Sequence, residues 1–175
     1  MSIGRYYIDG YNVIHQCARL RPLAEESFEA ARDALVERVA HYCAAVGVRI
    51  IIVFDGRGHA SDADPGLPSA PGLSIVFSSR NQTADAFIER EIYAARDRRD
   101  IVVVSADRGI RDLCGGLGSL TMQPDNFLAT IDMALSQARA SLNASQSGYS
   151  RTPVEDRLDA KSVKRLKAIR KRLPE

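Results

Sequence analysis

The sequence has few cysteines, no long apolar run and no lysine before residue 154. Its cysteines stand at positions 17, 43 and 114. This odd number, without CxxC spacing, argues against a disulfide framework or a zinc site and predicts packed, reduced thiols. No apolar stretch reaches the roughly 18 residues that a membrane span needs, and no basic-then-apolar signal segment opens the chain. We therefore expect a cytoplasmic protein with one main domain.

Charge is distributed unevenly along the chain. Residues 1–153 carry 16 arginines and 18 acidic residues, whereas every lysine lies in residues 154–175, which have a net charge of +4. A weakly acidic body with a basic tail predicts a polyanionic partner. A solvated terminal helix explains the tail equally well.

Apolar, β-branched runs alternate with helical periodicity. Strands are expected at residues 3–9, 49–55, 73–77, 100–105 and 119–122. Helices are expected after the capping residues Ser27 and Thr83, with Gly47 ending the first of them, and from Pro124 onward. The runs at 49–55 and 100–105 lack alternation, as in strands covered on both faces. The pattern predicts an α/β fold with a mainly parallel sheet.

Composition also divides the chain. We expect a folded domain at residues 1–142, a polar linker at 143–153 and a basic helical tail at 154–175. Within the domain, residues 61–72 are rich in proline and glycine and predict a surface loop.

Acidic residues follow the predicted strands. Asp9 and Asp55 end the first and second strands, and Asp107 lies just past the fourth. Asp85 falls in the first turn of the helix after the third strand, with Glu89 one turn later. Because ligands of open α/β sheets bind at the carboxyl ends of the strands, these acids are expected to converge there.

Clustered carboxylates repel one another unless cations lie among them. Oxygen donors without a nearby His or Cys pattern favour Mg²⁺ or Mn²⁺. One or two such ions suit phosphodiester hydrolysis, because they acidify water and stabilise the leaving oxygen. Taken singly, an aspartate at a strand end is more often a helix cap or turn former, so the inference rests on the repetition across strands.

Several neighbours extend this candidate site. Asn12 has an amide that can orient a water or a phosphate oxygen without adding charge. Thr83 and Ser105 can bind phosphate at helix N-termini, although simple capping is the commoner role at such positions. Arg80 and Arg108 flank the site in sequence and are candidate phosphate-binding residues.

The motifs YYIDGYNVIH, IIIVFDG, QTADAFIER and VVVSADRGIRDL, in this order, resemble the YacP-like branch of the NYN ribonucleases, within the PIN-like nuclease superfamily. The resemblance runs from about residue 3 to 142. It implies a Rossmann-like three-layer α/β/α fold and a divalent-metal site that hydrolyses RNA. The motif match places Asp9 and Asn12 in the DGYN element, Asp55 in FD, Asp85 in TAD and Asp107 in SAD.

These observations predict a metal-dependent endoribonuclease with Asp9, Asp85 and Asp107 as the leading metal ligands. Some relatives act on messenger RNA at the ribosome, which the basic tail, with Lys164 and Lys171, would suit. The main alternative is a non-catalytic RNA-binding or ribosome-associated module, and a second is an interaction scaffold whose tail docks on a partner. A dinucleotide-binding fold is disfavoured, since a loop follows GRGH where a helix must begin.

Overall fold

The computed structural model describes residues 4–56, 67–79 and 82–148. Its centre is a five-stranded parallel sheet in the order β3-β2-β1-β4-β5. The strands are β1 (Arg5–Asp9), β2 (Arg49–Phe54), β3 (Leu73–Phe77), β4 (Ile101–Val104) and β5 (Leu120–Met122). All five predicted strands are present. Chain order reverses beside β1, so the expected binding position lies where β1 and β4 end.

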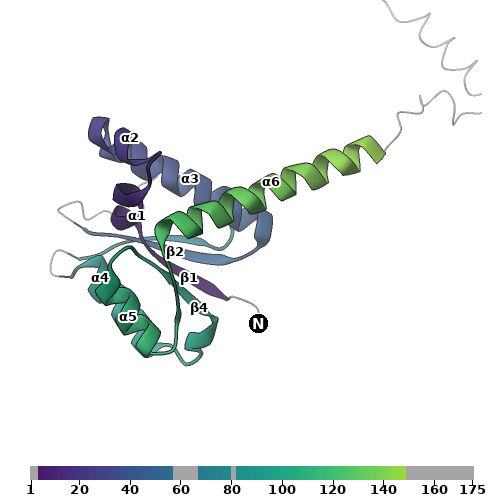
Figure 1. Cartoon of the computed structure of the whole chain (residues 1–175). Coiled ribbons are helices and arrows are strands. Elements are labelled where there is room, and N and C mark those ends of the chain that lie inside the picture. The colour runs from purple at the N-terminus through teal and green to yellow at the C-terminus, as the bar shows by residue number, and fades with distance from the viewer. Residues whose placement is uncertain (1–3, 57–66, 80–81, 149–175) are drawn as a thin grey trace, which may run out of the picture. The chain divides into compact units, whose positions relative to one another are not determined.

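Helices cover both faces of this sheet (Figure 1). The helices are α1 (Gly10–Gln16), α2 (Arg21–Glu26), α3 (Phe28–Val46), α4 (Ala84–Ala94), α5 (Arg108–Gly116) and α6 (Pro124–Gly148), with a 3-10 turn, η1, at Arg98–Asp100. One apolar core joins the sheet to α1, α3 and the start of α6, and a second joins it to α4 and α5. This arrangement confirms the predicted three-layer α/β/α architecture.

The predicted helix boundaries follow from local chemistry. The Ser27 hydroxyl accepts a hydrogen bond from the backbone N–H of Ala30 at 3.2 Å and so caps α3. Gly47 ends that helix with φ +74°, a left-handed conformation that glycine adopts without a steric penalty. Pro124 opens α6, where its missing N–H leaves no hydrogen bond unmade.

The two short helices α1 and α2 were not predicted. Helix α1 begins directly after β1, and the Asp9 carboxylate caps it by accepting from the backbone N–H of Asn12 at 3.0 Å. Each helix spans two turns or fewer, which is too short to show a helical period in the sequence. Asp9 therefore has the capping role as well as its place at the strand end.

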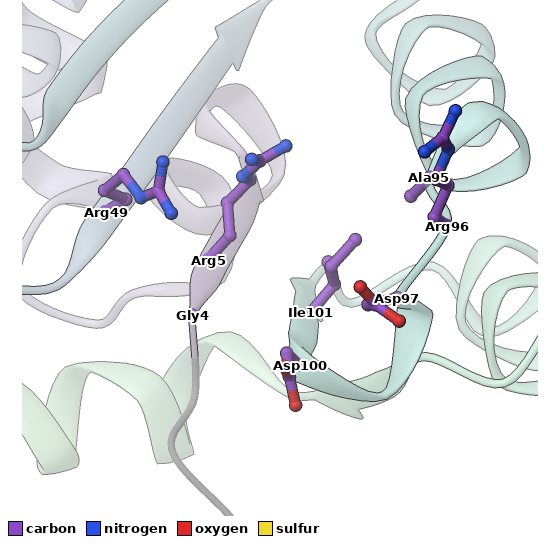
Figure 2. Close-up of a pocket in the computed structure, with 8 residues that line it drawn as sticks. All are labelled: Gly4, Arg5, Arg49, Ala95, Arg96, Asp97, Asp100 and Ile101. Atoms are coloured by element: carbon purple, nitrogen blue, oxygen red, sulfur yellow. The ribbon is translucent and has the colours of Figure 1, made fainter.

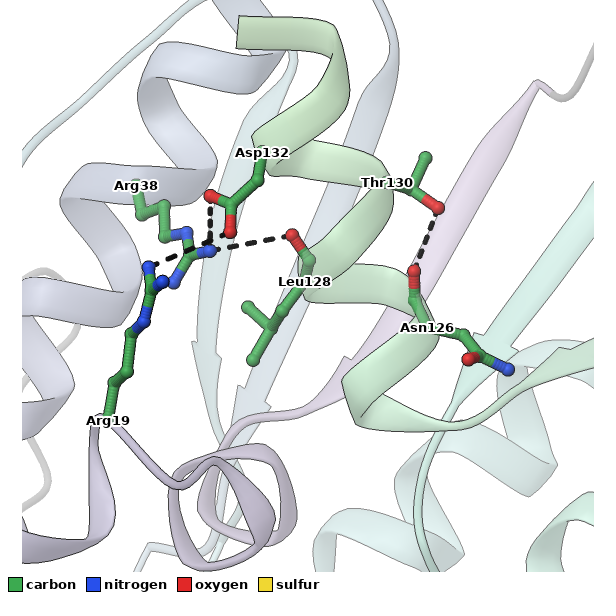
Figure 3. A network of polar contacts seen from close by, with 6 residues as sticks. All are labelled: Arg19, Arg38, Asn126, Leu128, Thr130 and Asp132. Atoms are coloured by element: carbon green, nitrogen blue, oxygen red, sulfur yellow. Dashed lines mark hydrogen bonds and ion pairs between the residues drawn. The ribbon is translucent and has the colours of Figure 1, made fainter. Parts of the chain in front are cut away.

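Polar contacts fasten the start of α6 to α3 (Figure 3). Arg38 on α3 forms an ion pair with Asp132 and donates to the carbonyl oxygen of Leu128 at 3.4 Å. Arg19 approaches the same carboxylate at 3.8 Å. Since the Arg38 side chain is only 19% exposed, its charge is best satisfied by this pairing.

The chain divides into two compact units between Ala138 and Arg139. Helix α6 continues to Gly148, so residues 143–148, predicted as the start of a linker, are helical. Leu142, expected on the apolar side of this helix, is 63% exposed. The basic tail lies outside the described residues. Within the described part of the chain, no helix combines the length and apolarity needed to cross a membrane.

The three cysteines are buried and unpaired, as predicted. Burial, with Glu89 and Asp85 adding to the effect, raises the pKa of Cys114 to about 11. Such a thiol stays protonated and unreactive at neutral pH. Cys114 therefore acts as a packing residue.

Candidate active site

Asp9 is the most enclosed of the predicted acidic site residues, with 8% of its surface exposed at the end of β1. Burial raises its pKa to about 6. The backbone hydrogen bond from Asn12 acts in the opposite direction, while the charges of Asp85 and Asp55 raise the pKa further. A carboxylate held in this way is unfavourable when ionised, unless a cation lies beside it.

Asp55 directly follows β2, and its carboxylate is hydrogen-bonded to the start of α4. Its Oδ1 accepts from the backbone N–H of Ala84 at 2.5 Å and from the Ser78 hydroxyl at 3.5 Å. The same hydroxyl accepts from the backbone N–H of Gly56 at 3.1 Å. Sequence reasoning missed Ser78, because its contribution depends on the pairing of β2 with β3. These bonds fix the Asp55 carboxylate beside the N-terminus of α4.

Gly56 lies against the chain that follows β3. A Cβ added there would come within 1.7 Å of the Ser78 carbonyl oxygen. Because this obstacle is backbone, we expect Gly56→Ala to lower the free energy of unfolding by about 1–3 kcal/mol, as overpacking typically does. Urea unfolding followed by circular dichroism measures the loss.

The matched control for this change is Gly116→Ala, where nothing lies within 4 Å of the added Cβ. This residue ends α5, so alanine there is expected to leave stability unchanged or slightly higher. Equal stability of the two variants would contradict the close approach at Gly56.

Asp107 caps α5 after β4. Its Oδ1 accepts from the backbone N–H of Gly109 at 2.6 Å, and its own N–H donates to the Ser105 hydroxyl at 3.1 Å. Ser105 is fully buried, and the Arg111 guanidinium donates to its carbonyl oxygen at 2.8 Å. Ser105 thus holds the turn that presents Asp107, and its contact with phosphate stays a prediction.

Asn12 connects two strand ends. Its Oδ1 accepts from the backbone N–H of Ala106 at 2.7 Å, which ties α1 to the turn after β4 across the point where strand order reverses. This oxygen is thus committed to positioning the backbone. The side-chain NH₂ group keeps two donors for a phosphate oxygen or a water.

Asp85 lies at the electrostatic centre of the acids. Burial raises its pKa, and the charges of Asp107, Asp55 and Glu89 raise it further; Asp85 in turn acts on Asp9. Its Oδ1 is buried and has no hydrogen-bond partner within the described residues. An ionisable oxygen in this state requires a counter-charge, a water or a proton.

The donor set fits a hard divalent cation. It consists of carboxylate oxygens, includes the orphaned oxygen of Asp85, and gathers negative charge that a cation would neutralise. Over residues 4–56, 67–79 and 82–148, no three His, Cys, Asp or Glu side chains already form a tight metal-binding group. The link between the described acids is instead electrostatic, because their charges raise the pKa values of Asp9 and Asp85.

The other residues predicted to contact phosphate are placed as follows, where the structure describes them. Thr83 is exposed and caps α4 by accepting from the N–H of Ala86 at 3.2 Å. Arg108 is 87% exposed and approaches Asp112 at 3.5 Å, a weak surface pair that leaves it able to turn toward an anion. Arg80, Lys164 and Lys171 lie outside the described residues.

Comparison with known proteins identifies the family and the fold of this chain. The family model described as YacP-like NYN domain matches residues 6–171, which include the predicted linker and most of the tail. The protein YacP of Bacillus subtilis (strain 168) is 36% identical over 126 residues, covering 71% of this chain and 73% of that protein.

Two crystal structures of Rae1 (YacP) from Bacillus subtilis share the fold. A mutant with leucine in place of a tryptophan matches with a TM-score of 0.69 at 26% identity, over 84% of this chain and 86% of that one. The other matches with a TM-score of 0.66 at 24% identity, over 98% and 96% of the two chains. The chain therefore belongs to the YacP-like NYN domain family.

Proposed function

We propose that the protein is a divalent-metal-dependent endoribonuclease that hydrolyses phosphodiester bonds within RNA. Membership of the YacP-like NYN family supports a nuclease or RNA-related function in general. The finer assignment rests on the acids that follow β1, β2, β3 and β4 at one edge of the sheet.

The observation that carries the proposal is the state of Asp85. Its buried, unpartnered oxygen lies within the electrostatic field of three other carboxylates. In a module that only bound RNA, this negative charge would weaken the binding of the RNA phosphates. A metal-dependent nuclease needs it, because the acids recruit the cation.

In this proposal Asp9, Asp85 and Asp107 hold the cation, and Asp55 adds charge while fixing the start of α4. When bound, Mg²⁺ or Mn²⁺ supplies Lewis acidity, which makes water a better nucleophile and stabilises charge on phosphate oxygens. The Asn12 NH₂ group orients a phosphate oxygen or the attacking water. Capping bonds from backbone N–H groups keep the Asp9 and Asp107 carboxylates in fixed orientations.

Phosphate is held by groups around this edge. The N-terminus of α4, at Thr83, carries partial positive charge and a hydroxyl that faces solvent. Arg108 lies at the first position of α5, and Arg80 precedes α4 in the chain. These residues would bind the phosphates of the RNA strand while the acids bind the cation.

The test is cleavage of a circular RNA, which only an endonuclease can open, with Mn²⁺, with Mg²⁺ and with EDTA. We expect a linear product with either cation and none with EDTA. RNA that is bound but stays circular under all conditions, including on ribosomes, would favour the non-catalytic RNA-binding module.

We further propose messenger RNA as the substrate, with cleavage at the ribosome. Comparing the same message free and within translating ribosomes tests this point. Faster cleavage on ribosomes is the expected result. Equal rates would remove the ribosome from the proposal while leaving the nuclease in place.

The basic tail supplies a separate prediction. Lys164→Glu combined with Lys171→Glu should weaken RNA binding and reduce the slope of log K against log salt, by about 0.7 for each phosphate that the tail no longer neutralises. Anisotropy titrations in EDTA at several salt concentrations measure the slope. The control combines Arg21→Glu with Arg139→Glu, two exposed sites with the same charge change. Equal slopes for the two double variants would exclude the tail from RNA binding.

A further inference from the structure

A pocket of about 300 Å³ lies at the amino end of the sheet, the edge opposite the candidate active site. It is formed by the starts of β1, β2 and β4 and by the segment after α4. Figure 2 shows Arg5 and Arg49 on one side of it, with Arg96 and Asp97 across from them. The pocket therefore collects cationic side chains from three separate parts of the chain.

Arg5 and Arg49 are direct neighbours in the β1–β2 register. Residues in register on adjacent strands lie on the same face of a sheet, about 5 Å apart, and like charges placed this way are destabilising. Among the described residues, no carboxylate lies within ion-pair distance of Arg5, Arg49 or Arg96. An anion between the arginines would relieve their repulsion.

The acids around the pocket do not neutralise it. Arg5 donates to the Tyr7 hydroxyl at 3.4 Å, and this hydroxyl donates to Glu91 at 3.4 Å. The Glu91 carboxylate also pairs with Arg90 at 3.7 Å, so its charge is shared. The Tyr7 contact instead fixes the direction of the Arg5 side chain.

Asp97 and Asp100 line the same pocket without an ion pair to its arginines. An inorganic anion such as sulfate could bind the arginines but would offer no hydrogen-bond donor to these two carboxylates. A ligand that combines an anionic group with hydrogen-bond donors would bind both the arginines and the aspartates of the pocket. A nucleotide does so, through its phosphate and its sugar hydroxyls.

We propose that this pocket binds the phosphate of a ribonucleotide, with Arg5, Arg49 and Arg96 around the phosphate and Asp97 and Asp100 accepting from sugar hydroxyls. The nucleotide is either free or part of an RNA strand. An RNA strand that contacted both edges of the sheet would have to span about 17 Å, which is the length of a five-residue β-strand. The binding site stands whether or not the opposite edge cleaves RNA.

The test measures binding to the full chain in EDTA, which prevents metal-dependent cleavage. The probes are adenosine monophosphate, by calorimetry, and a labelled RNA oligonucleotide, by anisotropy. The variants are Arg49→Ala and Arg96→Ala, both exposed, so the fold should tolerate them. Arg21→Ala is the charge-matched control, since Arg21 is exposed and does not line the pocket. Melting curves establish that all variants fold.

We expect both pocket variants to weaken binding about tenfold, as removal of a charge-assisted hydrogen bond does, and Arg21→Ala to leave it unchanged. Weaker binding of both probes indicates a site for free nucleotides, and weaker binding of the oligonucleotide alone indicates a contact with the RNA strand. Equal binding by pocket variants and control, or no binding of either probe by the wild type, would overturn the proposal.

Discussion

Asp85→Asn is expected to slow RNA cleavage by on the order of a hundredfold to a thousandfold. Asp85 contributes the unpartnered buried oxygen and interacts electrostatically with Asp9, Asp55, Asp107 and Glu89. Asparagine keeps the size of the side chain but removes the charge that attracts a cation. Losing several kcal/mol of transition-state stabilisation corresponds to a rate change of this size.

Two measurements separate this effect from general damage. Cleavage is followed in single-turnover reactions at saturating Mn²⁺, and the Mn²⁺-induced rise in melting temperature reports cation binding directly. Glu37→Gln, an exposed acid-to-amide change on α3, is the matched control and should behave like the wild type. Wild-type cleavage by Asp85→Asn would remove this residue from the metal site.

Asp9→Asn is expected to abolish cleavage while making the metal-free protein more stable. The Asp9 pKa is about 6 in the folded protein against an ordinary value of 3.8. Ionised Asp9 therefore opposes folding at neutral pH, by roughly 3 kcal/mol at most. Asparagine removes this penalty and can still accept the backbone hydrogen bond that caps α1. The measurement is urea unfolding in EDTA at pH 7.5.

The pH dependence gives an independent check on the same residue. Because folding raises this pKa, proton binding favours the folded state, so stability is gained as pH falls through about 6 and is complete below 3.8. The difference in stability between Asp9→Asn and wild type should therefore shrink over this window. A constant difference from pH 7.5 to 4 would contradict the raised pKa.

The position of the candidate site at the carboxyl ends of the strands could be predicted from the sequence. Continuous apolar runs mark buried parallel strands, and each of these runs is followed by an acidic residue. Asp9, Asp55 and Asp107 could be placed at strand ends by this reasoning alone. Parallel strands then require their carboxyl ends to meet. The presence of Asp85 in the same group follows from the helix cap at Thr83, which the structure confirms.

Other features depend on how strands pair and could not be found from the sequence. Ser78 reaches Asp55 only because β3 lies beside β2, and Arg5 is the neighbour of Arg49 only through the β1–β2 register. The sequence also gave no sign that the Ser105 hydroxyl accepts a hydrogen bond from the N–H of Asp107. These features depend on contacts and strand pairings that exist only in the folded chain.

The two ends of the parallel sheet differ in charge: carboxylates gather where the strands finish, whereas three arginines and two aspartates line the pocket where β1, β2 and β4 begin. Such a separation gives the domain an electric dipole along its strands. A nucleic acid approaching in low salt would first meet the arginine end, and the acidic end would repel it until cations were loaded. Divalent ions would thus control the orientation of the first encounter as well as the chemistry that follows it.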